Sequence, residues 1–131
     1  MPRYLIEANY LSEGINGLIK EGGTGRRAAV NELFSSLGGA LEAFYFAFGN
    51  EDLFIIGDLP DNASAAALTL KVNAAGVTRC KTTVLLTPQE IDDAVKMTST
   101  YRPPGHETPT EVANWESEGG HLMQDMTQNS T

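Results

Sequence analysis

Two strands and the turn between them lie in residues 41–59, which read LEAFYFAFGNEDLFIIGDL. Residues 41–48 and 53–59 are rich in aromatic and branched aliphatic side chains, which favour strands. Residues 49–52, Gly-Asn-Glu-Asp, have the composition of a turn. Two strands joined by so short a turn pair as an antiparallel hairpin, so this stretch predicts a β-hairpin.

The segment before the hairpin predicts one strand and two helical pieces. The strand covers residues 4–11, and Ser12 is expected to cap a short helical turn after it. A glycine-rich break over residues 21–25 follows, and a second helix is predicted from its cap, Thr24, to the residue before Gly38. The apolar residues of that helix share one face: Ala29, Val30, Leu33, Phe34 and Leu37.

The segment after the hairpin predicts two more helices around a fourth strand. Asp61 is a candidate N-cap for an alanine-rich helix that Gly76 ends. A strand is predicted over residues 77–86, and Thr87-Pro88 has the composition of a further helix start.

The resulting order of elements is β-α-β-β-α-β. It predicts an α+β, ferredoxin-like fold with a four-stranded antiparallel sheet and helices on one face. The strands over 41–48 and 53–59 carry apolar residues on both of their faces, so the sheet should be covered on both sides. One chain supplies helices for one side only, and we therefore expect a homodimer or a higher homo-oligomer.

The composition changes near residue 97. We expect residues 1–96 to form the folded domain and residues 97–131 to form a polar, acidic, extended C-terminal tail that cannot fold alone. The tail carries five acidic residues and few large apolar ones. We expect it to pack along its own subunit or a partner subunit, with Trp115 as the buried anchor.

Charge and composition exclude several classes of partner. The formal net charge of −8 argues against nucleic acid and against anionic membrane surfaces. Glu7 and Asn9 interrupt the N-terminal apolar run too early for a signal peptide, and no stretch approaches the roughly 18 apolar residues of a membrane helix. The single cysteine excludes an intrachain disulfide and fits a reducing compartment. The expectation is a cytoplasmic protein of bacterial type.

Three groups of residues have the side chains of a reactive thiol, a metal site or a phosphate site, but their sequence context gives little support for these roles. Cys80 is flanked by Arg79 and Lys81, but strand neighbours point to the opposite face, so an inert buried thiol is favoured. His106 and His121 lie in the tail at spacings that do not make a metal site. The glycine-rich residues 22–27 end in two arginines and resemble a phosphate cradle, although a flexible loop is favoured. We expect no metal and no cofactor.

A small group of polar residues forms the candidate ligand-binding site. Tyr45, Glu51 and Asp52 lie around the hairpin turn, and Asn9 and Arg27 are predicted to join them around a cleft between sheet and helices. The structural alternative is that the Asp52 carboxylate caps N–H groups of the turn, and that Tyr45 belongs to the core. The sequence leaves both interpretations open.

Several short motifs resemble the GYD domain family. They are Leu37-Gly38-Gly39, Phe44-Tyr45, Gly49-x-x-Asp52, the alanine-rich helix and Thr82-Thr83, together with Ser12-Glu13-Gly14-Ile15 and Arg27. The resemblance covers about residues 1–95. It implies a dimeric α/β barrel, in which two ferredoxin-like sheets pack face to face, and it implies no established activity. The family is named for a Gly-Tyr-Asp pattern, and here Glu51 stands where the tyrosine is expected.

Two functions remain open. The first is a dimeric small-molecule-binding or interaction module without catalysis. The second is a cofactor-independent enzyme, of monooxygenase or isomerase type, that acts on a small, partly apolar molecule in the barrel pocket. A ligand-sized cavity lined by a polar group in a perturbed environment would favour the enzyme.

Overall fold

The computed structural model describes residues 1–106. The chain divides into a first unit, Met1–Gln89, and a second unit that begins at Glu90. The predictions for Trp115 and His121 concern residues outside the described part, and the predicted domain boundary at residue 96 stays a prediction.

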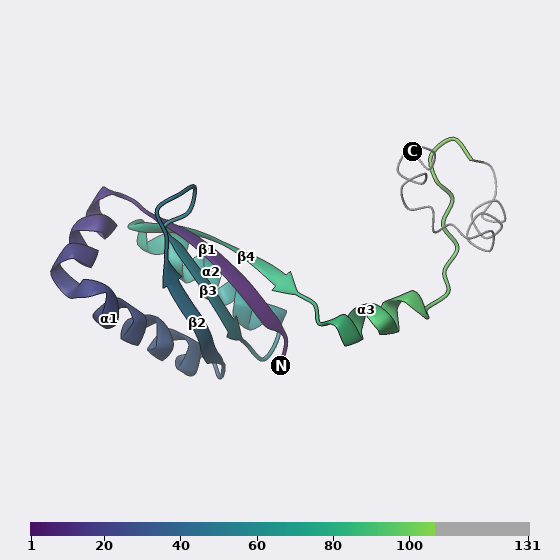
Figure 1. The fold of residues 1–131 in the computed structure, drawn as a ribbon, viewed down its shortest axis with the longest axis horizontal. Coiled ribbons are helices and arrows are strands. Elements are labelled where there is room, and N and C mark those ends of the chain that lie inside the picture. Colours follow the sequence, from purple (N-terminus) through teal and green to yellow (C-terminus); the bar gives the residue numbers. More distant parts are fainter. Residues whose placement is uncertain (107–131) are drawn as a thin grey trace. The chain divides into compact units, whose positions relative to one another are not determined.

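The first unit holds a four-stranded sheet and two long helices (Figure 1). Its elements are β1 (Arg3–Tyr10), α1 (Ser12–Ser36), β2 (Ala40–Phe46), β3 (Leu53–Asp58), α2 (Asn62–Ala75) and β4 (Thr78–Leu85). The strands lie in the order β2-β3-β1-β4, and every neighbouring pair is antiparallel. This is the α+β, ferredoxin-like arrangement that the order of elements predicts.

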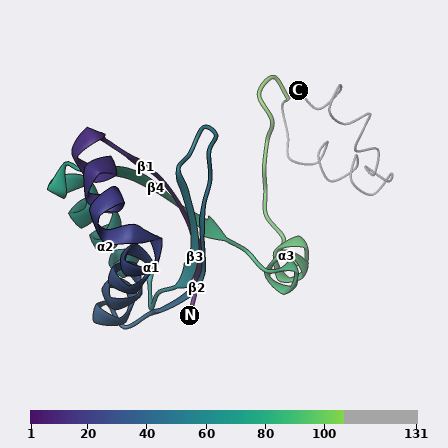
Figure 2. The ribbon, with the colours of Figure 1, turned by 60° about the vertical axis from the view of Figure 1, so that its left-hand side comes forward.

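Both long helices lie on the same side of the sheet (Figure 2). Strand alternation explains the core beneath them, because every second residue of a strand points to the same face. Tyr4, Ile6 and Ala8 of β1 are buried there, and Leu53 and Ile55 of β3 lie beside them. The helices add further buried residues, among them Val30, Phe34, Ala65 and Leu68.

The predicted ends of the two helices are confirmed. The Asp61 carboxylate accepts a hydrogen bond from the Ser64 backbone N–H at 2.9 Å and so caps α2, which ends at Gly76 with φ of 82°. At the end of α1, Gly38 also has φ of 82°, and Gly39 N donates to Phe34 O at 2.8 Å. Glycine adopts this left-handed backbone without the penalty that a Cβ would bring.

The start of α1 differs from the sequence prediction. Ser12 is the first residue of the helix and not its cap; Leu11 occupies the N-cap without a side-chain hydrogen bond. The predicted glycine-rich break is confirmed at Gly22, whose φ of 84° and ψ of 164° are not helical, so α1 consists of two helical pieces joined by a kink. The break is confined to this residue, so Thr24 lies inside the second piece and is not its cap, and residues 23–27 are helical and not a loop. A Cβ added at Gly23 would lie 3.1 Å from the Phe46 ring, so the kinked region packs tightly against β2.

The opposite side of the sheet, called the open face below, has no helix of the first unit over it. Register places Leu5 opposite Ile56 and Tyr45 opposite Phe54 on this side. Ion pairs lie around these side chains: Arg3 with Asp58 at 3.0 Å, Arg3 with Glu42 at 2.9 Å, and Lys81 with Glu51 at 3.3 Å. The open face thus carries several apolar side chains, with Glu7 of β1 in register with Phe54 and Lys81 among them and ion pairs around them.

The remaining helix, α3 (Pro88–Val95), begins at the proline that marks its predicted start. Ile91, Ala94 and Val95 share one side of it by helical spacing. Among the described residues, no helix has the length and apolar character needed to cross a membrane.

Candidate functional site

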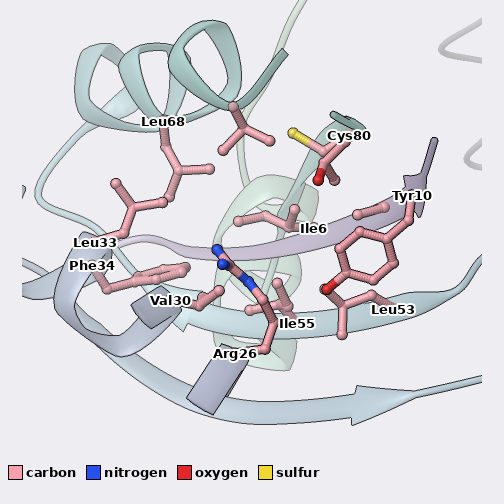
Figure 3. Close-up of a pocket in the computed structure, with 13 residues that line it drawn as sticks. Ile6, Tyr10, Arg26, Val30, Leu33, Phe34, Leu53, Ile55, Leu68 and Cys80 are labelled. Carbon is pink, nitrogen blue, oxygen red and sulfur yellow. The ribbon is translucent and has the colours of Figure 1, made fainter. Parts of the chain in front are cut away.

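A small cavity of about 60 Å³ lies between the sheet and the two long helices (Figure 3). Its walls are mainly apolar and include Val30 and Phe34 of α1, Ile55 of β3 and Cys80 of β4. Two polar groups are directed into the same space, the Tyr10 hydroxyl from β1 and the Arg26 guanidinium from α1. An apolar space with few polar groups is the usual form of a small-molecule site.

Tyr10 is the most informative residue of this cavity. Its hydroxyl oxygen is buried and has no hydrogen-bond partner within the described part of the chain. Burial raises the pKa of the Tyr10 phenol; the Arg26 charge opposes this, and the charges of Asp52 and Glu21 add to it. The phenol therefore stays protonated near neutral pH and offers a hydrogen-bond donor. An unpaired buried hydroxyl costs roughly 1–3 kcal/mol, so a ligand that bonds to it recovers that cost.

Arg26 is held by a partner in its own helix. Its Nη1 atom lies 3.3 Å from Oε1 of Glu21, on the other side of the Gly22 kink. The predicted ligand residue Arg27 is exposed on α1 and does not line the cavity, while its neighbour Arg26 does. The kink and the helical register decide which of the two arginines faces inward.

Tyr10 also lines an open groove of about 390 Å³. It runs between the N-terminal part of α1 and the hairpin that joins β2 to β3. Its lining includes Tyr10, Ile15, Leu18, Phe46, Phe48 and Asp52. Phe48 is fully exposed, which is unusual for so large an apolar side chain.

Asp52 joins the hairpin to β1. Its Oδ2 atom accepts a hydrogen bond from Tyr10 N at 2.9 Å, and its backbone N–H donates to Ala8 O at 2.9 Å. The carboxylate therefore has the structural role that the sequence suggested, but it accepts from the end of β1 and not from the turn itself. It also lines the groove, so it serves both the fold and the candidate site.

Asn9, Glu51 and Tyr45 lie elsewhere. Asn9 donates from Nδ2 to Oε1 of Glu51 at 2.7 Å, and the second Glu51 oxygen pairs with Lys81, so these groups meet on the open face. Tyr45 is 71% exposed on the same face, so the alternative that places it in the core of this chain is wrong. None of the three lines the cavity or the groove. Their role in ligand binding stays a prediction.

The candidate site from sequence did not include Tyr10, Phe46 or Phe48, and Arg26 entered only through the resemblance of residues 22–27 to a phosphate cradle. For Tyr10 a signal was present, because alternation places it on the same face as Ile6 and Ala8, at the point where the strand ends. An aromatic residue with a polar tip at the end of a buried face often lies at a pocket mouth. The groove lies beside the α1 kink, which is within the predicted glycine-rich break, but the approach of Phe46 and Phe48 to that helix does not follow from local pattern.

Cys80 is buried, as the sequence favoured, and burial raises the pKa of its thiol. Its backbone bonds to the Asn73 side chain through both N–H and C=O, at 2.8 and 3.1 Å. No group of three or more metal-ligating side chains occurs within residues 1–106.

Comparison with known families supplies the identification. The model of the GYD domain matches residues 4–95, from β1 to the end of α3. The chain belongs to the GYD domain family. The matched part of this GYD domain contains the cavity, the groove and the open face. No curated protein and no solved structure matches the chain.

Proposed function

We propose that this GYD domain is a homodimeric module that binds a small, partly apolar molecule beside Tyr10. The observation that carries the proposal is the buried Tyr10 hydroxyl, which has no partner in residues 1–106 and belongs to a residue that lines both the cavity and the groove. Burying a hydroxyl without a partner is unfavourable in a purely structural element. A bound ligand supplies the missing acceptor.

The volumes indicate how such a ligand lies. The groove, at about 390 Å³, is within the range of small-molecule sites, roughly 300–1,000 Å³. The cavity, at about 60 Å³, is smaller than the roughly 150 Å³ space that accommodates benzene. The body of the ligand therefore occupies the groove, and only a small end group reaches past the Tyr10 ring.

The proposal of a dimer rests on the open face. Leu5, Phe54, Ile56 and Tyr45 form its apolar centre, and Arg3 and Lys81 hold ion pairs around it. A second copy related by a two-fold axis presents the same surface and buries the apolar centre. This arrangement is the dimeric barrel that family resemblance implies.

A cofactor-independent enzyme is the second candidate, and the Tyr10 phenol is the observation that favours it. Its raised pKa keeps the phenol protonated, which suits a hydrogen-bond donor to a substrate oxygen and not a phenolate base. The small enclosed volume supports binding in the groove more than chemistry in the cavity. The binding module is therefore the function we propose.

The test compares Tyr10→Phe with wild type in a screen of small aromatic and aliphatic compounds. Tyr101→Phe is the matched control, because it removes the same atom from a residue outside the site. We expect compounds that raise the melting temperature of wild type and of the control to lose affinity for Tyr10→Phe. No binding by wild type, or equal binding by both variants, contradicts a site at Tyr10.

A further inference from the structure

The groove beside Tyr10 carries information about the charge of its ligand. Three aromatic rings, those of Tyr10, Phe46 and Phe48, line it, together with Ile15 and Leu18. The rings of Phe44 and Phe46 pack edge to face with centroids 5.2 Å apart, so Phe46 is held by its neighbour on the inner side of β2. The aromatic lining is therefore partly fixed in place before a ligand arrives.

One charged group lines this groove, the carboxylate of Asp52. Its position is fixed by the bond to Tyr10 N and by the two backbone hydrogen bonds of Asp52 to Ala8 and Ala47, each 2.9 Å long. Within the described residues, no lysine, arginine or histidine forms an ion pair with it. A half-buried carboxylate without a cation beside it favours a positively charged ligand, because the attraction is stronger where water is partly excluded.

Arg26 does not reverse this preference. Its guanidinium already pairs with Glu21 at 3.3 Å, and it lines the inner cavity and not the groove. The formal net charge of the chain, −8, also draws cations towards the protein at long range. The local charge at the groove and the overall charge have the same sign.

We propose that the groove recognises a small organic cation, an amine or alkylammonium group on an apolar body. The cationic group lies over the aromatic rings, where the ring faces attract it, and pairs with Asp52; the apolar body contacts Ile15 and Leu18. This inference rests on the proposed function and names the chemical class of its ligand. The proposed ligand is a free small molecule and not a segment of a protein chain, since the groove has the volume of a small molecule.

The test uses three probes of nearly equal shape: phenethylamine, 2-phenylethanol and 3-phenylpropanoate. They are cationic, neutral and anionic near neutral pH, and their dissociation constants are measured with the full chain by titration followed in amide NMR spectra. We expect the amine to bind about tenfold more tightly than the alcohol, from combined ion-pair and ring contributions, and the carboxylate to bind most weakly. Shifts confined to groove residues place the binding.

Asp52→Asn is the decisive variant, because asparagine still offers an oxygen to Tyr10 N while removing the charge. We expect its affinity for the amine to fall to that for the alcohol, and its affinity for the alcohol to change by less than about twofold. Asp61→Asn is the matched control: it removes the same charge at the other end of β3, where asparagine is an equally good cap. It should leave all three affinities unchanged.

The outcomes separate this inference from the proposed function. Equal binding of the three probes, or loss of amine affinity in Asp61→Asn as large as in Asp52→Asn, overturns the cation class and leaves the binding module standing. Tighter binding of the carboxylate also overturns the class, and assigns Arg26 the ligand instead. If neither these probes nor any compound of the wider screen binds near Tyr10, both proposals are wrong.

Discussion

The two faces of the sheet are built from the same strands and differ in how they are completed. On the helix side, Phe34 and Leu59 are 0% exposed, and Tyr4 and Ile6 of β1 are 1% and 2% exposed. On the open face, Leu5, Phe54 and Ile56 remain half-buried and Tyr45 is 71% exposed. The difference teaches that the helices of one chain bury the centre of one face of the sheet and leave the other face partly uncovered, which is where we propose that a second copy packs.

The adjacent residues Ile55 and Ile56 give the largest and sharpest test of this contrast. Ile55 is 4% exposed under the helices, whereas Ile56 lies on the open face. Ile55→Ala should lower the free energy of unfolding by about 2–5 kcal/mol, since it leaves a cavity in the core. Denaturant titration at several protein concentrations measures this loss of unfolding free energy relative to wild type, and we expect the same loss at every concentration.

Ile56→Ala should behave differently. If a second copy covers the open face, its loss of stability grows as the protein is diluted, because the dimer dissociates before it unfolds. Equal, concentration-independent losses for the two isoleucine variants would remove the distinction between the faces.

The next largest effect on stability is expected at Gly57, a glycine on the helix side of the sheet. A Cβ at Gly57 would overlap the Phe34 ring, so the close approach of α1 to β3 requires glycine there. Gly57→Ala should cost about 1–3 kcal/mol of stability, as overpacking does in other cores. Ala43→Gly, on the open face of the neighbouring strand, serves as the control and should change the unfolding free energy less. An unchanged stability in Gly57→Ala would mean that α1 does not approach the sheet so closely.

The two tyrosines of β1 should respond in opposite directions. The Tyr4 hydroxyl donates to Asn62 Oδ1 at 2.6 Å, whereas the Tyr10 hydroxyl has no partner in residues 1–106. Tyr4→Phe should lower stability by about 0.5–1.5 kcal/mol, and Tyr10→Phe should raise it by about 1 kcal/mol in the absence of ligand. Thermal unfolding measures both. A loss of stability in Tyr10→Phe would indicate a bonded hydroxyl and a purely structural role.

The smallest effect concerns pH at the start of α2. The hydrogen bonds from the Ser64 backbone and side chain to Asp61 lower the pKa of that carboxyl. A lowered pKa means that the contribution to stability is complete above the ordinary aspartate pKa and is lost as pH falls through the folded value, below about pH 4. Asp61→Asn should flatten this acid-side part of the melting-temperature profile. A profile identical to wild type would show that the cap does not titrate in this range.

Local chemistry predicted most of the fold and little of the site. The hairpin, the Asp61 cap and the glycine at the end of α1 depend on neighbouring residues, and the structure confirms them. The kink of α1 at Gly22 also lies within the glycine-rich break that the sequence predicts, although the break is confined to one residue. Tyr10 and Arg26 come to line the same cavity only after β1 and the kinked helix have packed together, so their spacing along the chain does not predict a shared site.

The most direct test of the account is the mass of the protein in solution. Light scattering at micromolar concentration should give twice the chain mass for wild type if, as we propose, a second copy completes the open face. Ile56→Lys places a charge at the centre of that face and should give a folded monomer, with Ile56→Val as the control that keeps the dimer. A monomeric wild-type protein, or a dimer that Ile56→Lys leaves intact, would contradict the claim.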